Sequence, residues 1–318
     1  MKIIYFGTPE FAASQLEAII AAGYEVAAVV TAPDKPAGRG KKLQSPEVKK
    51  TALSHQLPVL QPERLRDPNF QKNLEAFHAD LFIVVAFRML PASVWKMPKL
   101  GTFNLHASLL PQYRGAAPIN HAIINGETQT GLTTFFLNEE IDKGAILMRQ
   151  AVAIRPDETA GELHDELMTL GNKMVVETIR LIENNMAKPI QQDQIADATT
   201  LMTAPKIFKD DCFIHWERTC LSIYNLIRGL SPYPAAHTRL QSDQGDIVEL
   251  KIYSSTIEPI TTHKAPGTVV SDGKTFLKIA ANDGFISLIT IQQAGKKAMN
   301  IEDFLRGMRL QGQWNAVI

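Results

Sequence analysis

The chain has few cysteines, no long apolar run and no excess of either charge. Its 318 residues include only Cys212 and Cys220 and no C-x-x-C pair, which argues against a disulfide framework and a cysteine-based zinc site. No apolar run approaches the roughly 20 residues that span a bilayer. Residues 1–6 carry one lysine and too short an apolar run for a signal peptide. We therefore expect a cytoplasmic protein whose first residues form a buried strand.

Charge is balanced over the whole chain but not locally. The 33 Lys and Arg residues equal the 33 Asp and Glu residues, so the basic excess typical of nucleic-acid-binding proteins is absent. In residues 31–50, however, six basic and two acidic residues give a net charge of +4. Prolines and glycines there exclude a continuous helix or strand and predict a long basic loop. Such loops are often lids or binding loops, but charge runs also occur on inert surfaces, so composition leaves both readings open.

The order of apolar segments predicts a Rossmann-like α/β domain with a doubly wound, mainly parallel sheet. Alternation of strands and helices implies parallel pairing with helical crossovers. A dinucleotide cofactor is rejected, because G-x-G-x-x-G is absent and Pro9 stands where a second glycine would admit phosphate. Strands are expected at 2–6, 25–31, 81–86, 102–106 and 132–137, and helices at 14–22, 46–56, 69–78 and 159–184.

A second, smaller domain is expected after a linker. Residues 185–208 are rich in Gln, Asp, Thr and Ala and lack a sustained apolar period, so we expect domains at 1–184 and 209–318. Short strands with turn signals follow a helix in the second part, which is typical of a small β-barrel. The helix is expected at 219–230, and the strands at 247–256, 267–270, 276–280 and 284–291.

Residues 104–118 are the most informative segment. Asn104 and His106 stand two residues apart at the end of an expected strand, so their side chains share one face at a separation of roughly 6.6 Å. Asp142 follows the next apolar segment in a turn, from which a carboxylate can orient an imidazole. A hydrogen-bonded structural histidine beside leucines is also common, so Asn104 and His106 alone do not establish an active site.

The wider pattern resembles a known family. The run N-x-H-x-S-L-L-P-x-Y-R-G-A-A-P at 104–118, with Asp142-x-Gly144 downstream, is similar to the folate-dependent formyltransferases. The resemblance extends through G-T-P-E-F-A at 7–12, the basic stretch at 33–43 and G-K-K-A-M at 295–299, and it includes the branch that acts on methionyl-tRNA. It implies an OB-like C-terminal domain that binds tRNA. It also implies transfer of a formyl group from 10-formyltetrahydrofolate to the α-amino group of initiator methionyl-tRNA.

The resemblance assigns roles to individual residues. Asn104 and His106 would donate hydrogen bonds to the formyl oxygen, and Asp142 would orient His106 and help remove a proton from the attacking amine. The folate is expected beside Ser108, Leu109, Leu110 and Pro111, and beside Phe87, Arg88, Met89 and Leu90. This second segment is one residue shorter than is common and lacks an aromatic-Gly pair. The tRNA is expected to contact Lys35, Arg39, Lys41, Lys42, Lys296 and Lys297.

Three alternatives stay open. A formyltransferase acting on a sugar-nucleotide or ribonucleotide amine would share the Asn/His/Asp centre without needing the basic loop or the C-terminal domain. A folate hydrolase would use the same centre with water as acceptor, and a non-catalytic RNA-binding protein would keep only the loop and the barrel. No metal is expected, because H-E-x-x-H is absent and the cluster at 164–166 lies in an ordinary helical pattern.

Overall fold

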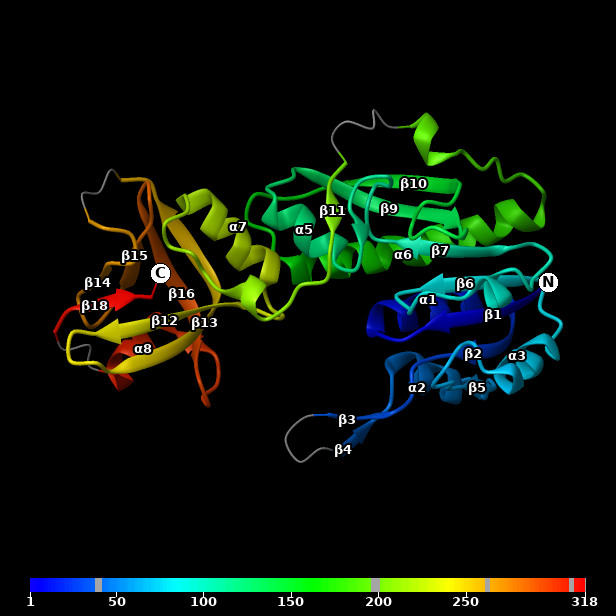
Figure 1. The fold of residues 1–318 in the computed structure, drawn as a ribbon, viewed down its shortest axis with the longest axis horizontal. Helices are drawn as coiled ribbons and strands as arrows, with labels where there is room; N and C mark the ends of the chain where they lie inside the picture. Colours follow the sequence, from blue (N-terminus) through cyan, green and yellow to red (C-terminus); the bar gives the residue numbers. More distant parts are fainter. Residues whose placement is uncertain (38–41, 196–200, 261–263, 309–311, 318) are drawn as a thin grey trace. The chain divides into compact units, whose positions relative to one another are not determined.

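The computed structural model describes residues 1–37, 42–195, 201–260, 264–308 and 312–317 (Figure 1). They form two compact units that are interleaved along the sequence. The first comprises Met1–Gly115, Thr130–Val152 and His164–Thr203, and the second comprises Ala116–Gln129, Ala153–Leu163 and Ala204–Ile318. From the sequence we expected domains at 1–184 and 209–318 with a linker at 185–208; in the structure, residues 116–129 and 153–163 also group with the C-terminal part.

The first unit is built on a seven-stranded sheet with the order β10-β9-β7-β6-β1-β2-β5. Neighbours from β5 to β7 pair in parallel, whereas β9 runs antiparallel to β7. This confirms the expected mainly parallel α/β sheet. The strands are β1 (Lys2–Gly7), β2 (Glu25–Val30), β5 (Val59–Leu60), β6 (Leu81–Val85), β7 (Thr102–His106), β9 (Gln129–Phe136) and β10 (Ile146–Ala153).

Helices connect and flank these strands (Figure 1). Helix α3 begins where the sequence supplies a suitable start: Pro68 stands in its first turn, and the Asp67 side chain accepts a hydrogen bond from the Asn69 N–H. Among the described residues, no helix is long and apolar enough to cross a membrane. The helices are α1 (Glu10–Ala21), α2 (Glu47–Ser54), α3 (Pro68–Glu75), α4 (Ala92–Trp95) and α6 (Ala160–Glu183).

Strand β1 lies in the middle of the core and is buried on both faces. Its residues Ile3, Ile4, Tyr5 and Phe6 are fully buried, as a strand between two helical layers requires. Ile4 and Phe6 pack in an apolar cluster with residues of α3, while the Tyr5 hydroxyl donates to the Ala12 carbonyl at 2.6 Å. Burial raises the pKa of Tyr5 well above its usual value. The rigid centre of the sheet therefore lies beside the strands that carry the candidate site.

The basic stretch at 31–50 is not structureless. It contains an antiparallel pair, β3 (Lys35–Ala37) and β4 (Lys42–Gln44), before α2 begins at Glu47. At the base of this hairpin, the Asp34 carboxylate accepts from Lys49 Nζ at 2.7 Å and from Gln61 Nε2 at 2.9 Å. The Lys49 hydrogen bond is the largest of the contacts that lower the Asp34 pKa. Pro36 is tolerated because a two-stranded hairpin leaves one side of each strand unpaired.

The second unit contains a nearly closed antiparallel barrel, which confirms the expected small β-barrel. Strands follow the order β14-β15-β16-β13-β12-β18, with β17 paired to β16. A bridge between Thr268 and Asn315, with a 2.7 Å hydrogen bond from Ala316 N to Gly267 O, joins the two ends. The strands are β12 (Ala236–Ser242), β13 (Ile247–Glu258), β14 (Val269–Ser271), β15 (Leu277–Ala280), β16 (Phe285–Gln293), β17 (Met299–Asn300) and β18 (Trp314–Ala316).

Among the described residues, the α-helices that lie wholly in the second unit are α5 (Pro118–Ile124), α7 (Cys220–Leu230) and α8 (Ile301–Gly307). Helix α7 begins at the Thr219 cap and packs closely against α5 at Gly229. A Cβ added at Gly229 would lie 2.6 Å from Ile124 Cγ1, and Asn120 Nδ2 donates to the Gly229 carbonyl at 2.8 Å. The barrel core is filled by apolar side chains around Trp216, whose indole N–H donates to Thr238.

Candidate active site

The candidate site lies where β6 and β7 end in the first unit. These two strands are parallel, so their carboxyl ends lie side by side. The loop that follows β6 at residue 86 and the loop that follows β7 at residue 107 therefore start next to each other. Asn104 and His106 occupy alternate positions on β7, so their side chains share a face as expected. Strand β7 ends at His106, which places this residue at the carboxyl ends of the strands, where ligands bind in open α/β sheets.

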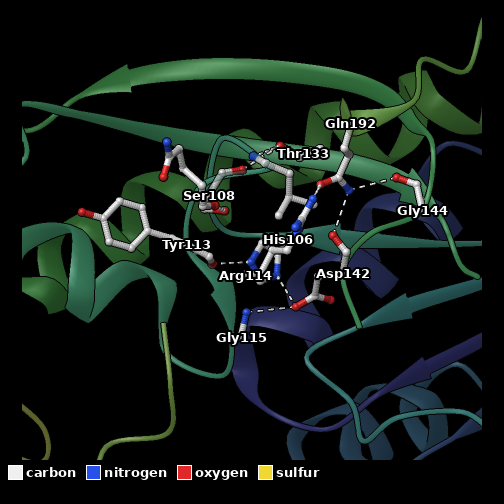
Figure 2. A network of polar contacts seen from close by, with 11 residues as sticks. His106, Ser108, Tyr113, Arg114, Gly115, Thr133, Asp142, Gly144 and Gln192 are labelled. Carbon is white, nitrogen blue, oxygen red and sulfur yellow. Dashed lines mark hydrogen bonds and ion pairs between the residues drawn. The ribbon is translucent and has the colours of Figure 1, made fainter. Parts of the chain in front are cut away.

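The His106 ring is held by a backbone carbonyl. It is almost fully buried, and its Nε2–H donates to the Tyr113 carbonyl oxygen at 2.9 Å (Figure 2). Tyr113 has a left-handed φ of 57°, which turns the chain back toward β7. With Nε2 engaged, Nδ1 faces Asp142, whose Oδ2 is 3.9 Å away. That distance is an electrostatic contact and exceeds hydrogen-bond length, so the hydrogen bond that holds the ring is the one to Tyr113, while Asp142 acts on it at longer range.

Asp142 reaches His106 by way of a loop that folds back. Strand β9 runs antiparallel to β7 and ends beside Phe103, at the end of β7 opposite to His106, so strand direction alone does not bring Asp142 near His106. Asp142 adopts a left-handed φ of 53°, and its Oδ2 accepts from the Gly115 N–H at 3.0 Å (Figure 2). At Gly144 a Cβ would lie 1.6 Å from the Phe136 carbonyl oxygen. Only glycine fits there, so Gly144 allows the backbone of the turn to pack closely against the end of β9.

Asn104 is the least engaged of the three polar side chains. It lies opposite Val84 on β6 and Phe135 on β9 and is half-buried. Its amide makes no hydrogen bond to any residue that the structure describes. A half-buried amide with this freedom can donate to a ligand oxygen at the sheet edge.

Two further residues complete the polar network, and the sequence analysis did not assign a role to either. Gln192 is 3% exposed, and its Nε2 donates to the carbonyl oxygens of Asp142 at 2.8 Å and Gly144 at 2.9 Å. Its Oε1 accepts from Arg114 Nε at 3.1 Å and Nη2 at 2.5 Å (Figure 2). Burial lowers the pKa of Arg114, and the nearby Asp142 and Glu140 carboxylates oppose that shift.

The loop after β7 is held in place by hydrogen bonds within the loop and to β9. Ser108 is fully buried, and its hydroxyl donates to the Gln112 carbonyl at 2.6 Å. Thr133 Oγ1 on β9 donates to the Ser108 carbonyl at 2.7 Å and accepts from the Leu110 N–H at 3.1 Å. Leu110 and Pro111 are buried, whereas Leu109 is half-buried. Of the four residues of this segment that are expected beside the folate, Leu109 thus retains the most accessible side chain.

The segment after β6 is divided between core and surface. Leu90 is buried in the apolar core, and Met89 is 73% exposed. The Arg88 guanidinium donates to the carbonyl oxygens of Glu63 and Pro62 and lies 5.5 Å from the Phe87 ring centre. In the part of the chain that the structure describes, the backbone groups of 87–90 make no hydrogen bond to another backbone group. They can pair with a polar heterocycle, which fits the expected folate position.

The basic residues expected to contact tRNA lie in two separate units. Lys35 is exposed on β3 and Lys42 lies on β4, while Arg39 and Lys41 fall outside the described residues. Lys296 and Lys297 are exposed on the turn between β16 and β17. Their turn is closed by hydrogen bonds from Lys296 N to the Gln293 carbonyl and from Gln292 Nε2 to the Lys296 carbonyl. Within the described ranges no cluster of three potential metal ligands occurs.

Comparison with known proteins covers both units. The formyl transferase family model matches residues 1–179, and the formyl transferase C-terminal domain model matches residues 206–309. A methionyl-tRNA formyltransferase of Bacteroides fragilis is 51% identical over 310 residues, covering 98% of this chain and 96% of the relative. One from Bacteroides thetaiotaomicron is 52% identical over 311 residues with the same coverages.

Solved structures extend the likeness at the level of the fold. The sugar 3N-formyl transferase WlaRD, solved with dTDP and 5-N-formyl-THF, is 20% identical with a TM-score of 0.64, covering 93% of this chain and 99% of its own. HypX from Aquifex aeolicus, solved with tetrahydrofolic acid, is 19% identical with a TM-score of 0.63, covering 98% of this chain and 48% of its own. At these identities the likeness establishes the fold only.

Proposed function

Because the chain belongs to the formyl transferase family, we propose that it transfers a formyl group from 10-formyltetrahydrofolate to the α-amino group of initiator methionyl-tRNA. The observation that carries this proposal is the identity of about half the residues, over both units, with methionyl-tRNA formyltransferases. The product would be N-formylmethionyl-tRNA for translation initiation, made in the cytoplasm. Sugar-nucleotide and ribonucleotide amines are the second class of acceptor to test.

Asn104 and His106 are proposed to stabilise charge on the formyl oxygen. Attack of an amine on the formyl carbon builds negative charge on that oxygen, and hydrogen-bond donors aimed at it lower the barrier. The Asn104 amide is unengaged by the described residues. The His106 Nε2–H is already given to Tyr113, so Nδ1 is the ring nitrogen left for the substrate side. Donation from Nδ1 requires a proton there, which the Asp142 carboxylate at 3.9 Å would stabilise.

Asp142 is proposed to receive the proton that the attacking amine loses. Its Oδ2 accepts one hydrogen bond from Gly115, which leaves acceptor capacity on the carboxylate. The side chain is 17% exposed, so it can be reached from the substrate side or through one water molecule. Held beside His106, the carboxylate would then serve both the imidazole and the amine.

The backbone of 87–90 and the Leu109 side chain are proposed to hold the folate. The backbone groups of 87–90 are unpaired with other described backbone groups and lie at the sheet edge that carries His106. Leu109 follows β7 at that same edge and retains accessible apolar surface. Bound there, the folate would supply an activated formyl group, so the reaction needs no metal.

The basic residues are proposed to hold the acceptor tRNA through its phosphates. Lys35 and Lys42 lie on the hairpin, Arg39 and Lys41 stand between them in the sequence, and this stretch carries a local positive charge on a neutral chain. Lys296 and Lys297 project from an exposed turn. Cationic side chains of this kind position a nucleic acid through its backbone without reading its sequence. Both groups would therefore raise affinity for tRNA and act little on the folate.

A formylation assay tests the proposal. Purified protein is incubated with 10-formyltetrahydrofolate and one acceptor at a time: methionyl initiator tRNA, a sugar-nucleotide amine, glycinamide ribonucleotide, or water alone. We expect formylmethionine on the tRNA, and formyl transfer only to another acceptor would overturn the assignment. In the Arg39→Ala variant we expect a KM for tRNA about tenfold higher, in line with loss of a charge-assisted phosphate contact, and unchanged folate affinity. Equal loss of folate affinity would refute the role of the hairpin.

A further inference from the structure

The chain between α6 and the second unit is bonded directly to the candidate active site. We call residues 185–204 the connector; the structure describes its residues 185–195 and 201–204. Ile190 exchanges two backbone hydrogen bonds with Ile146, at 2.8 and 2.9 Å. Met202 accepts from the Tyr113 N–H at 2.8 Å, and Tyr113 is the residue whose carbonyl orients His106. The sequence analysis expected a linker here, but the described parts make specific polar contacts.

Gln192 makes the largest set of these contacts. Its amide oxygen accepts two hydrogen bonds from Arg114, and its amide nitrogen donates to the carbonyl oxygens of Asp142 and Gly144. A neutral amide is the side chain that offers both an acceptor and two donors at one carbon, so glutamine matches this position. Because Gln192 is almost fully buried, each lost contact would leave a buried polar group without its partner.

The contacts close a ring around Asp142. Arg114 binds Gln192, Gln192 binds the Asp142 carbonyl, and the Asp142 carboxylate accepts from Gly115, the residue after Arg114 (Figure 2). The main chain of Asp142 is thus fixed from one side and its carboxylate from the other. This matters because Asp142 adopts a left-handed φ of 53°, which a non-glycine residue holds only when its surroundings impose it.

We propose that Gln192 is a positioning residue for formyl transfer, holding the 142–144 turn so that the Asp142 carboxylate faces His106 Nδ1. This inference rests on the proposed function, because the reaction is what makes the position of Asp142 consequential. A displacement of about 1 Å in a reacting group can lower turnover about 100-fold. Gln192 is almost fully buried and its amide is engaged by Arg114 and the 142–144 turn, so its loss should act on kcat and leave substrate binding in place.

Three variants separate positioning from folding. Gln192→Ala removes every contact, while Gln192→Glu keeps an oxygen acceptor for Arg114 but removes the N–H donors to the turn. Gln191→Ala is the matched control, because Gln191 is the neighbouring residue and is exposed. We expect kcat to fall about 100-fold in both Gln192 variants, with both KM values within about twofold of the wild type, and no change in the control.

Amide hydrogen exchange without substrate gives a second readout. We expect faster exchange in the 138–145 segment of both Gln192 variants, and wild-type exchange in the β1 core and in the Gln191 control. An unchanged kcat, or a loss of kcat that only matches the unfolded fraction, would overturn the positioning role. If the wild-type protein formylates no tRNA, the proposed function fails, and the exchange of 138–145 alone then decides whether Gln192 holds the turn.

Discussion

The segment 104–118 and the connector differ in how clearly the sequence indicates their roles. The first carries a dense motif whose polar residues alternate on one strand and run into a Pro/Gly loop. The connector is rich in Gln, Asp, Thr and Ala, without a period. In the folded chain, however, the connector supplies the partner of the Asp142 and Gly144 carbonyls and the carbonyl that binds Tyr113 N–H. Residues that carry chemistry thus leave a sequence pattern, whereas residues that support them need none.

The largest expected loss of kcat in this comparison comes from the segment 104–118, at Asn104. In Asn104→Ala we expect kcat to fall by about 10²–10³, because one donor to the formyl oxygen is lost. Asn104→Asp keeps the size of the side chain but replaces the donor with an acceptor, and it should lose as much. Steady-state kinetics with circular dichroism as a folding check measures both. Near wild-type turnover in Asn104→Asp would mean that the residue acts through packing.

A substitution at Gly144 tests whether a residue that only supports Asp142 can lower kcat nearly as much as Asn104→Ala does. A Cβ in Gly144→Ala would lie 1.6 Å from the Phe136 carbonyl oxygen, so the turn must shift and carry Asp142 with it. We expect kcat to fall about tenfold or more, and the free energy of unfolding to drop by about 1–3 kcal/mol. Urea unfolding and kinetics measure the two losses. Gly307→Ala is the control, because nothing lies within 4 Å of an added Cβ there; full activity in Gly144→Ala would show that the turn tolerates displacement.

A substitution at Thr133 is expected to lower kcat least. It tests how much the hydrogen bonds of Thr133 stabilise the loop at 108–110. Thr133→Val keeps the shape but removes the hydroxyl that binds the Ser108 carbonyl and the Leu110 N–H. We expect a loss of about 1–3 kcal/mol in the free energy of unfolding and a severalfold lower kcat. Thr130→Val is the control, since the Thr130 hydroxyl is buried on the same strand and has no hydrogen-bond partner among the residues that the structure describes. Equal losses in the two variants would exclude a specific role for the Thr133 hydroxyl.

The sequence predicted those parts of the fold that have a local pattern. Strand β7 begins at Thr102 and ends at His106, as expected, because the apolar run there is bounded by Gly101 and by a loop that contains proline and glycine. The hairpin at residue 35 was missed, since prolines and glycines point to a loop whether or not the chain pairs with itself. The antiparallel direction of β9 was also missed, because its apolar residues suit either direction.

The candidate site divides in the same way. Asn104, His106 and Asp142 stand out because their side chains interrupt apolar segments at a strand end or in a turn. Tyr113 holds the His106 ring through its carbonyl, and every residue has a carbonyl, so no side-chain pattern marks that role. Gln192 lies 50 residues beyond Asp142 among other glutamines, and only the folded chain distinguishes it from Gln191.

The barrel of the second unit is closed by its last strand, and this affects more than its shape. Strands β14 and β18 are the two ends of the sheet order, and the bridge at Thr268 and Asn315 lets each cover the other. An uncovered strand edge is a template for pairing with another molecule. Cleavage between β16 and β18 that released the last strand would uncover two such edges at once. The few residues of β18 thus keep two strand edges covered as well as completing the barrel.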